Sequence, residues 1–168
     1  MNVNEEKTTV VEKAVDSSLT FELNGKKMQL DVDPSRRLVD VLRIDLDMTG
    51  TKVSCEVGRC GACIVLIDGA PHNSCLTMAY QCDGKKVETI EGFQDDVMDP
   101  VQQAFLEEGA LQCGYCTPGM VMSLKGLLKE NEAPNYEEMK ESLSGNICRC
   151  TGYGGIQRVL RRLSVNEG

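Results

Sequence analysis

The residues best suited to chemistry in this chain are cysteines, and eight of the nine fall into two groups of four. The first group consists of Cys55, Cys60, Cys63 and Cys75. Its C-x4-C-x2-C opening is typical of a loop that wraps a diiron cluster, with the fourth thiolate supplied from elsewhere. The glycines inside CEVGRCGAC can adopt positive φ and bring backbone N–H groups close to sulfur. A single zinc ion more often uses two short C-x2-C knuckles.

The second group consists of Cys113, Cys116, Cys148 and Cys150. Cysteines one residue apart are awkward around one zinc ion but suit one edge of a diiron cluster. Helices are predicted to begin directly after each half of this group, at Thr117-Pro118 and after Thr151-Gly152. Their free N–H groups and positive dipole ends would then face a centre with net negative charge.

Two further residues could act as metal ligands. Cys82 is interpreted as a small buried hydrophobic residue, although its position leaves it as an alternative to Cys75 as fourth ligand. His72 is the only histidine, and it is interpreted as a surface residue in a turn.

Composition narrows the classes of function. The chain has 168 residues, and 18 Lys and Arg stand against 26 Asp and Glu, so its net charge of −8 argues against nucleic acid as a partner. Residues 1–17 contain no apolar stretch long enough for export or for spanning a membrane, and we expect them to form a disordered extension. A cytoplasmic protein without membrane contact is therefore expected, and in a reducing compartment clustered cysteines indicate metal more often than disulfides.

The elements that position the cysteines change in type along the chain. Strands are predicted over 20–23, 26–32, 63–67 and 86–90, with a hairpin turn at Asn24-Gly25. Helices are predicted from Leu38 towards Gly50, and then with starts near Pro100, Thr117, Asn135 and Ile156. We expect one domain over 18–94 that contains a mixed sheet and a second over 95–168 that contains four helices.

The loops CEVGRCGAC and QCGYCTPGM, with NICRCTGY closing the second site, resemble the iron–sulfur subunit of the xanthine dehydrogenase and aldehyde oxidase family of molybdenum hydroxylases. The resemblance extends from about Leu19 to Leu163. It implies an α+β protein with an N-terminal β-grasp, ferredoxin-like domain and a following all-α four-helix domain, each holding one [2Fe–2S] cluster. The implied ligands are Cys55, Cys60, Cys63 and Cys75 in the first domain, and Cys113, Cys116, Cys148 and Cys150 in the second.

The same resemblance implies a role in electron transfer. Single electrons would pass from a molybdopterin centre on a large subunit, through the two clusters, to FAD on a medium subunit, within a dimer of heterotrimers. Gln112 matches the glutamine that hydrogen-bonds the pterin in this family. No catalytic residue is expected in this chain, which lacks a P-loop, a convincing dinucleotide fingerprint and a nucleophile with a histidine base. It is expected to be an enzyme only as a subunit of an oxidoreductase complex.

The expected substrate of that complex is xanthine or hypoxanthine, because SCEVGRCGAC and NSCLTMAYQ are most similar to separate small subunits of bacterial xanthine (purine) dehydrogenases. Oxidation of an aldehyde, nicotinate or carbon monoxide is the alternative within the family. A free-standing, diffusible ferredoxin and a zinc-stabilised interaction module are the alternatives outside it.

Overall fold

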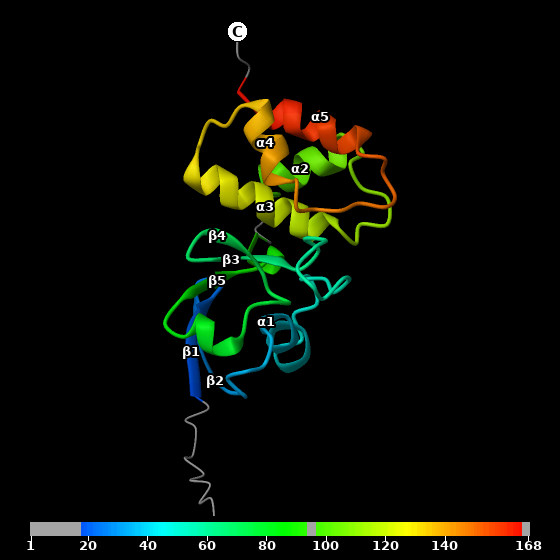
Figure 1. The fold of residues 1–168 in the computed structure, drawn as a ribbon. Helices are drawn as coiled ribbons and strands as arrows, with labels where there is room; N and C mark the ends of the chain where they lie inside the picture. Colours follow the sequence, from blue (N-terminus) through cyan, green and yellow to red (C-terminus); the bar gives the residue numbers. More distant parts are fainter. Residues whose placement is uncertain (1–17, 94–96, 166–168) are drawn as a thin grey trace, which may run out of the picture.

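The computed structural model describes residues 18–93 and 97–165, which form two regions stacked on one another (Figure 1). Residues 18–93 contain a sheet with short helical turns, and we call them the sheet region. Residues 97–165 contain four helices, and we call them the helical region. This order confirms the predicted α+β fold class. The predicted extension over 1–17 lies outside the described residues, as does the predicted domain boundary at 94/95.

Within residues 18–93, five strands pair in the order β2-β1-β5-β3-β4. They are β1 (Ser18–Leu23), β2 (Lys26–Asp31), β3 (Ile64–Ile67), β4 (Ala70–Asn73) and β5 (Lys86–Glu88). β1 and β5 run parallel, and the other neighbours run antiparallel. The predicted hairpin is confirmed, with Asn24 and Gly25 at φ values of 48° and 78°. The sequence did not predict β4, because APHN has no apolar alternation and forms an edge strand.

The helix predicted from Leu38 is present, but it changes type after one turn. α1 (Leu38–Asp40) continues as the π-helical segment η1 (Val41–Asp45), where the N–H of Leu46 donates to the carbonyl of Val41. Leu38 and Leu42 are fully buried against the sheet. The apolar spacing therefore predicted the buried face correctly, while the wider turn had no signal in the sequence. Two 3-10 turns were also not predicted, η2 (Ala79–Cys82) and η3 (Ile90–Phe93).

The helical region consists of α2 (Pro100–Glu107), α3 (Thr117–Glu130), α4 (Tyr136–Ser142) and α5 (Gly154–Leu163). The helix starts predicted near Pro100 and Asn135 are confirmed, and each has a side-chain cap. The Asp99 carboxylate accepts from the N–H of Val101 at 2.9 Å, and Asn135 and Glu138 form a reciprocal capping box. α3 packs on the other helices and also contacts β3 and β4, so it lies between the two cores (Figure 1). Within the described ranges, no helix is long and apolar enough to cross a membrane.

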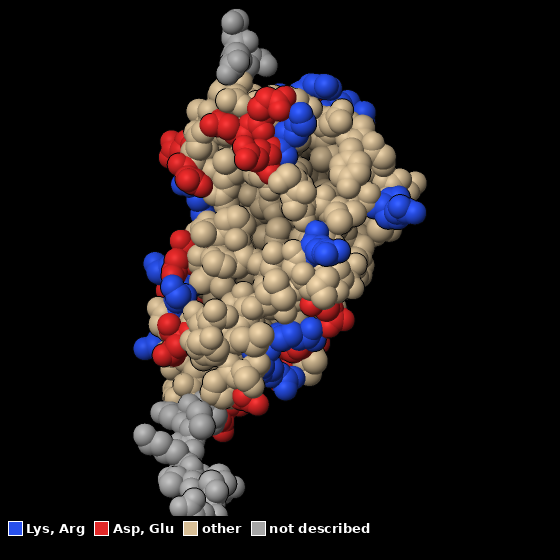
Figure 2. All heavy atoms as spheres, in the orientation of Figure 1, with Lys and Arg blue, Asp and Glu red and all other residues tan. Residues whose placement is uncertain are grey.

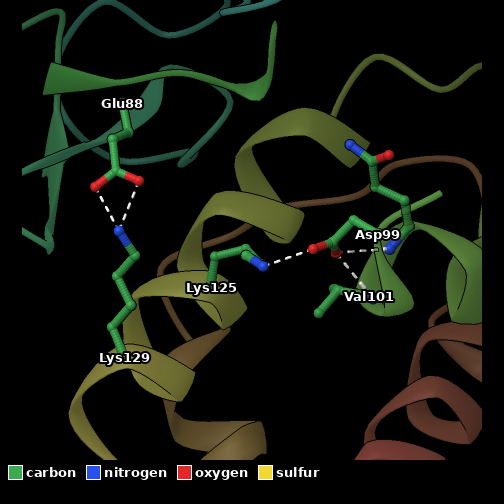
Figure 3. Close-up of polar contacts among 6 residues, drawn as sticks. Glu88, Asp99, Val101, Lys125 and Lys129 are labelled. Atoms are coloured by element: carbon green, nitrogen blue, oxygen red, sulfur yellow. Dashed lines mark hydrogen bonds and ion pairs between the residues drawn. The ribbon is translucent and has the colours of Figure 1, made fainter. Parts of the chain in front are cut away.

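Two lysines of α3 join it to neighbouring segments (Figure 3). The Lys129 ammonium donates to both carboxylate oxygens of Glu88 on β5. The Lys125 ammonium lies 2.5 Å from the Asp99 carboxylate and 4.6 Å from the centre of the Phe93 ring. Since Phe93 and Asp99 stand on either side of residues 94–96, Lys125 anchors the chain before and after the connection between the regions.

Candidate metal centres

The first cysteine group is assembled by one loop and one hairpin. Cys55 and Cys60 lie in the loop that precedes β3, and Cys63 directly precedes its first residue. The β3–β4 hairpin returns the chain so that the N–H and hydroxyl of Ser74 both donate to the carbonyl of Cys63, at 3.3 and 2.7 Å. Cys75 is thereby placed beside Cys63, and both are buried.

The loop itself is tightly curled. Glu56, Gly58 and Gly61 have φ values of 56°, 72° and 68°, and the N–H of Arg59 points to the sulfur of Cys55 at 3.2 Å. Backbone N–H groups of Val57 and Arg59 favour the thiolate and lower the pKa of Cys55 to about 7. Such a loop presents N–H groups to an anionic sulfur, as the glycine pattern predicts.

An ion-pair network fastens this loop to α1. The Arg37 guanidinium donates to the Asp40 carboxylate at 2.7 Å and to the Glu56 carboxylate at 2.6 Å. These two carboxylates hold the pKa of Arg37 above its ordinary value. Glu56 directly follows Cys55, so the network positions the start of the loop.

The second group is assembled from two segments that meet in front of helices. Cys116 is the N-cap of α3, and Cys148 and Cys150 precede α5. The sulfurs of Cys113 and Cys150 lie 3.4 Å apart. Both predicted helix starts are therefore confirmed, and each brings a pair of cysteines to the same end of the helical region.

Side chains surround the buried half of this group. The Thr151 hydroxyl donates to the sulfur of Cys148 at 3.1 Å, and the Tyr153 hydroxyl accepts from the N–H of Cys148 at 2.9 Å. Burial acts to raise the pKa of Cys148, but the donors from Thr151 outweigh it and the pKa is lowered. Burial raises the pKa of the neighbouring Cys116 to about 12.

The thiols of each group lie in pairs. The pairs are Cys55 with Cys60, Cys63 with Cys75, Cys113 with Cys150, and Cys116 with Cys148. In the described parts of the chain, no three His, Cys, Asp or Glu side chains converge closely enough to hold a single metal ion. Two pairs per group match the needs of a [2Fe–2S] cluster, in which each of two irons takes two thiolates. In addition, the Thr117 hydroxyl beside Cys116 is buried and has no partner among the described residues, which leaves a donor for a bound group.

The two groups lie next to each other across the contact between the regions. The N–H of Ile147 donates to the carbonyl of Cys60 at 2.9 Å, and Ile147 directly precedes Cys148. The Tyr115 hydroxyl donates to the carbonyl of Val53 at 2.7 Å. One hydrogen bond therefore connects the backbone of a cysteine in the first group with the backbone next to a cysteine in the second.

The loops of both groups reach the same side of the molecule, at the right in Figure 1. Figure 2 shows that many charged side chains gather on the opposite side, whereas the area over these loops is mostly uncharged with a few charged residues. The large apolar side chains that are exposed on or beside the loops are Val57, Leu76, Leu111, Tyr115, Ile147 and Tyr153. Such an area is suited to contact with another protein surface.

Comparisons with known proteins agree with this geometry. Two family models match: the 2Fe-2S iron–sulfur cluster binding domain over residues 21–94 and the [2Fe-2S] binding domain over residues 89–161. A probable xanthine dehydrogenase subunit of Bacillus subtilis (strain 168) is 53% identical, covering 84% of this chain and 82% of its own. The nicotine 6-hydroxylase small subunit of Paenarthrobacter nicotinovorans is 50% identical, and the match covers 82% of this chain and 84% of that subunit. Quinoline 2-oxidoreductase from Pseudomonas putida 86 has a solved chain that matches with a TM-score of 0.81 and 45% identity, covering 86% and 90%.

The chain belongs to the iron–sulfur subunits of the molybdenum hydroxylases. One matched model covers the sheet region and the other covers the helical region, so this iron–sulfur subunit has two 2Fe-2S binding domains. Its role is electron transfer within an oxidoreductase complex. The predicted family, cofactor and role are thereby confirmed, while the relatives differ in substrate.

Three residues singled out by the sequence are not members of the thiol pairs of the iron–sulfur subunit. Cys82 is fully buried in the core of the sheet region, and burial raises the pKa of its thiol to about 11. His72 is exposed on β4. Gln112 is exposed beside Cys113, on the side of the helical region that carries the second group.

Sequence reasoning missed the side chains that connect the two groups and those that flank Cys148. Tyr115 and Asn146 each reach from the helical region to the loop of the first group. Thr151 and Tyr153 flank Cys148 from within the same turn. A polar side chain within or next to a cysteine motif was the available signal, but the partners of Tyr115 and Asn146 lie far away in the sequence and only the fold brings them together.

Proposed function

We propose that the eight paired cysteines are the ligands of two [2Fe–2S] clusters. Each pair would hold one iron, with Cys55/Cys60 and Cys63/Cys75 for the first cluster and Cys113/Cys150 and Cys116/Cys148 for the second. The observation that carries this proposal is the division of both groups into two thiol pairs, one buried more deeply than the other. When bound, each cluster supplies a reversible one-electron oxidation and reduction.

The residues around the pairs would stabilise the charge of such centres. N–H groups of the curled loop face Cys55, and the Thr151 hydroxyl faces Cys148. The first turn of α3 begins at Cys116, so its free N–H groups and positive dipole end lie at the second centre. Burial of Cys63 and Cys116 disfavours charge at those sulfurs, which makes metal binding the means by which they deprotonate.

We further propose an order of electron flow. Electrons would pass from a molybdopterin centre on a large subunit to the second centre, then to the first centre, and then to FAD on a medium subunit. Support comes from Gln112 and the Cys113/Cys150 pair, which are exposed and can therefore be reached by a partner. The Gln112 side chain is proposed to form a hydrogen bond with the pterin, as donor or as acceptor.

We propose a dimer of heterotrimers, located in the cytoplasm, that oxidises xanthine or hypoxanthine. Similarity to the Bacillus subtilis protein supports the purine substrate, and the nearly equal similarity to a nicotine 6-hydroxylase small subunit supports a test against pyridine substrates as well.

A comparison of two buried cysteines tests the ligand assignment. The purified chain is expected to contain about four irons and four acid-labile sulfides, with two distinct electron paramagnetic resonance signals after reduction. Cys75 and Cys82 are both buried, yet only Cys75 is paired with another thiol. Cys75→Ala should therefore remove one signal and about half of the iron, whereas Cys82→Ala should retain both. Stoichiometric zinc in a colourless protein, or the reverse behaviour of the two variants, contradicts the assignment.

Co-expression with the genomic neighbours tests the partners. A large molybdopterin subunit and a flavin subunit should co-purify with the chain, and the complex should reduce an acceptor in the presence of xanthine. Gln112→Ala should slow substrate reduction of the second cluster without loss of iron, while Gln157→Ala, an exposed glutamine on α5, serves as the control. A chain that stays monomeric and exchanges electrons with unrelated reductases favours a diffusible ferredoxin instead.

A further inference from the structure

The loops of the two cysteine groups meet at one buried side chain, Asn146. It is 4% exposed, and its Nδ2 donates to the carbonyl of Gly61 at 3.2 Å. Its Oδ1 lies 2.8 Å from the hydroxyl of Ser123 on α3, and Ser123 is buried as well. Gly61 follows Cys60 and Asn146 stands two residues before Cys148, so one amide contacts the first loop and belongs to the second.

The contact leaves no space for adjustment. A Cβ at Gly61 would lie 2.5 Å from Nδ2 of Asn146, and a Cβ at Gly119 on α3 would overlap the carbonyl oxygen of Gly61. The peptide between Gly61 and Ala62 therefore packs directly on the α3 backbone and on the Asn146 amide. A shift of either loop breaks the hydrogen bond between Asn146 and Gly61.

A second hydrogen bond connects the two groups beside this contact. The carbonyl of Cys60 accepts from the N–H of Ile147, and Asn146 is covalently joined to Ile147. Asn146 thus binds the residue after Cys60 while its own neighbour binds Cys60 itself. Two adjacent hydrogen bonds fix both the separation and the register of the loops.

We infer that Asn146 is a positioning residue for electron transfer between the two centres of this subunit. Its amide holds the carbonyl of Cys60 against the N–H of Ile147, which gives a route with a single hydrogen bond from Cys60 to the residue before Cys148. The inference rests on the proposed function, because it requires Cys60 and Cys148 to be cluster ligands. The Tyr115 contact to Val53 supplies a second link between the regions, but it runs through a residue that is 45% exposed and ends two residues before Cys55.

The test compares Asn146→Ala and Asn146→Asp with Lys129→Met in the full chain. Asp keeps an oxygen for Ser123 but removes the donor to Gly61, so it isolates the hydrogen bond that crosses the regions. Lys129→Met also breaks a polar contact between the regions, the one with Glu88, but away from the cysteine loops (Figure 3). Each protein is analysed for iron, for the magnetic interaction between the two reduced clusters, and for the rate of electron exchange between them after rapid partial reduction.

Both Asn146 variants should retain their iron and show a weaker magnetic interaction. The exchange rate should fall roughly tenfold or more, the order of loss that follows small misplacement of reacting groups. Lys129→Met should match the wild type in both readouts. Should Asn146→Ala fail to fold, Asn146→Asp decides the question alone.

Unchanged magnetic interaction and unchanged exchange rate in an iron-replete Asn146→Asp protein overturn the inference. A purely structural role for Asn146 predicts that result, with a lower melting temperature as its only effect. Failure of the proposed function is seen separately, because the wild-type chain would then lack one or both cluster signals before any variant is compared.

Discussion

The two cysteine sites differ in how much of the fold each one requires. The first site takes three of its cysteines from one curled loop, which backbone N–H groups and positive φ values shape from within. The second site joins two segments separated by α3 and α4, and it relies on helix starts and on side chains such as Thr151 and Tyr153. The first site is thus mostly local, whereas the second exists only when the helical region is packed.

This difference explains which residues of the chain determine each cysteine site. The conformation of a local loop can be predicted from the spacing of its glycines, as between Cys55 and Cys63. A site made by tertiary packing depends on the buried residues of the helices that support it, among them Met120 and Leu124 on α3 and Ile156 on α5. Damage to the helical core should therefore affect one centre much more than the other.

The largest expected effect comes from opening each core in turn. Leu124 and Leu42 are fully buried in the helical and sheet cores, so Leu124→Ala and Leu42→Ala should each lower the free energy of unfolding by about 2–5 kcal/mol. Leu124→Ala should also lose the second cluster signal while it keeps the first. Urea unfolding followed by circular dichroism, with paramagnetic resonance of the reduced proteins, measures both. Equal loss of the two signals would mean that the first site depends on the helical core as much as the second site does.

A smaller effect is expected where the regions touch. Gly119→Ala places a Cβ against the carbonyl oxygen of Gly61, so it should cost about 1–3 kcal/mol through overpacking. Gly145→Ala is the control, because a Cβ there meets nothing within 4 Å. Thermal unfolding of both variants gives the comparison. A Gly119→Ala protein as stable as wild type would show that the loop of the first site moves easily away from α3.

The hydroxyl of Thr151 distinguishes the sites electronically. Thr151→Val removes a donor to the sulfur of Cys148, and the reduction potential of the second cluster should fall by tens of millivolts while the first stays constant. Thr89→Val removes a buried hydroxyl that donates to Glu91 instead, so it should change neither potential. Redox titration monitored by paramagnetic resonance measures both clusters. A shift of the first potential in Thr151→Val would argue that the two centres are not electrostatically separate.

The smallest effect is expected at the surface of the first site. Glu56→Gln weakens the ion pair with Arg37, and both side chains are partly exposed, so the cost in stability should be only about 0–1 kcal/mol. The first cluster signal should persist, because the loop is shaped by backbone contacts. Unfolding at low and high salt tests this, since the difference between variant and wild type should shrink as salt screens the pair. Loss of the first signal would make the ion pair, and not the backbone, the determinant of the loop.

The sequence predicted the parts of this molecule that local patterns control. The Asn24-Gly25 hairpin, the Asp99 and Asn135 caps and the helix starts after Cys116 and Cys150 follow from residue preferences, and all are present. β4 and the π-helical turn of η1 were missed, because an edge strand without apolar alternation and a widened turn leave no periodic signal. The link from Asn146 to Gly61 was missed for a different reason: it depends on packing between the two regions.

The paired thiols also constrain the unfolded chain. Once metal bridges Cys55, Cys60, Cys63 and Cys75, the closed segment is short, whereas a bridge from Cys113 to Cys150 encloses α3 and α4. The loss of chain entropy on closing a loop grows with the logarithm of its length, by about 0.6 kcal/mol for each doubling. The bridge from Cys113 to Cys150 therefore removes more conformational entropy from the unfolded chain than the bridges of the first site do. The helical region, which relies more on tertiary packing to form its site, is also the region whose unfolded state a bound cluster would restrict more.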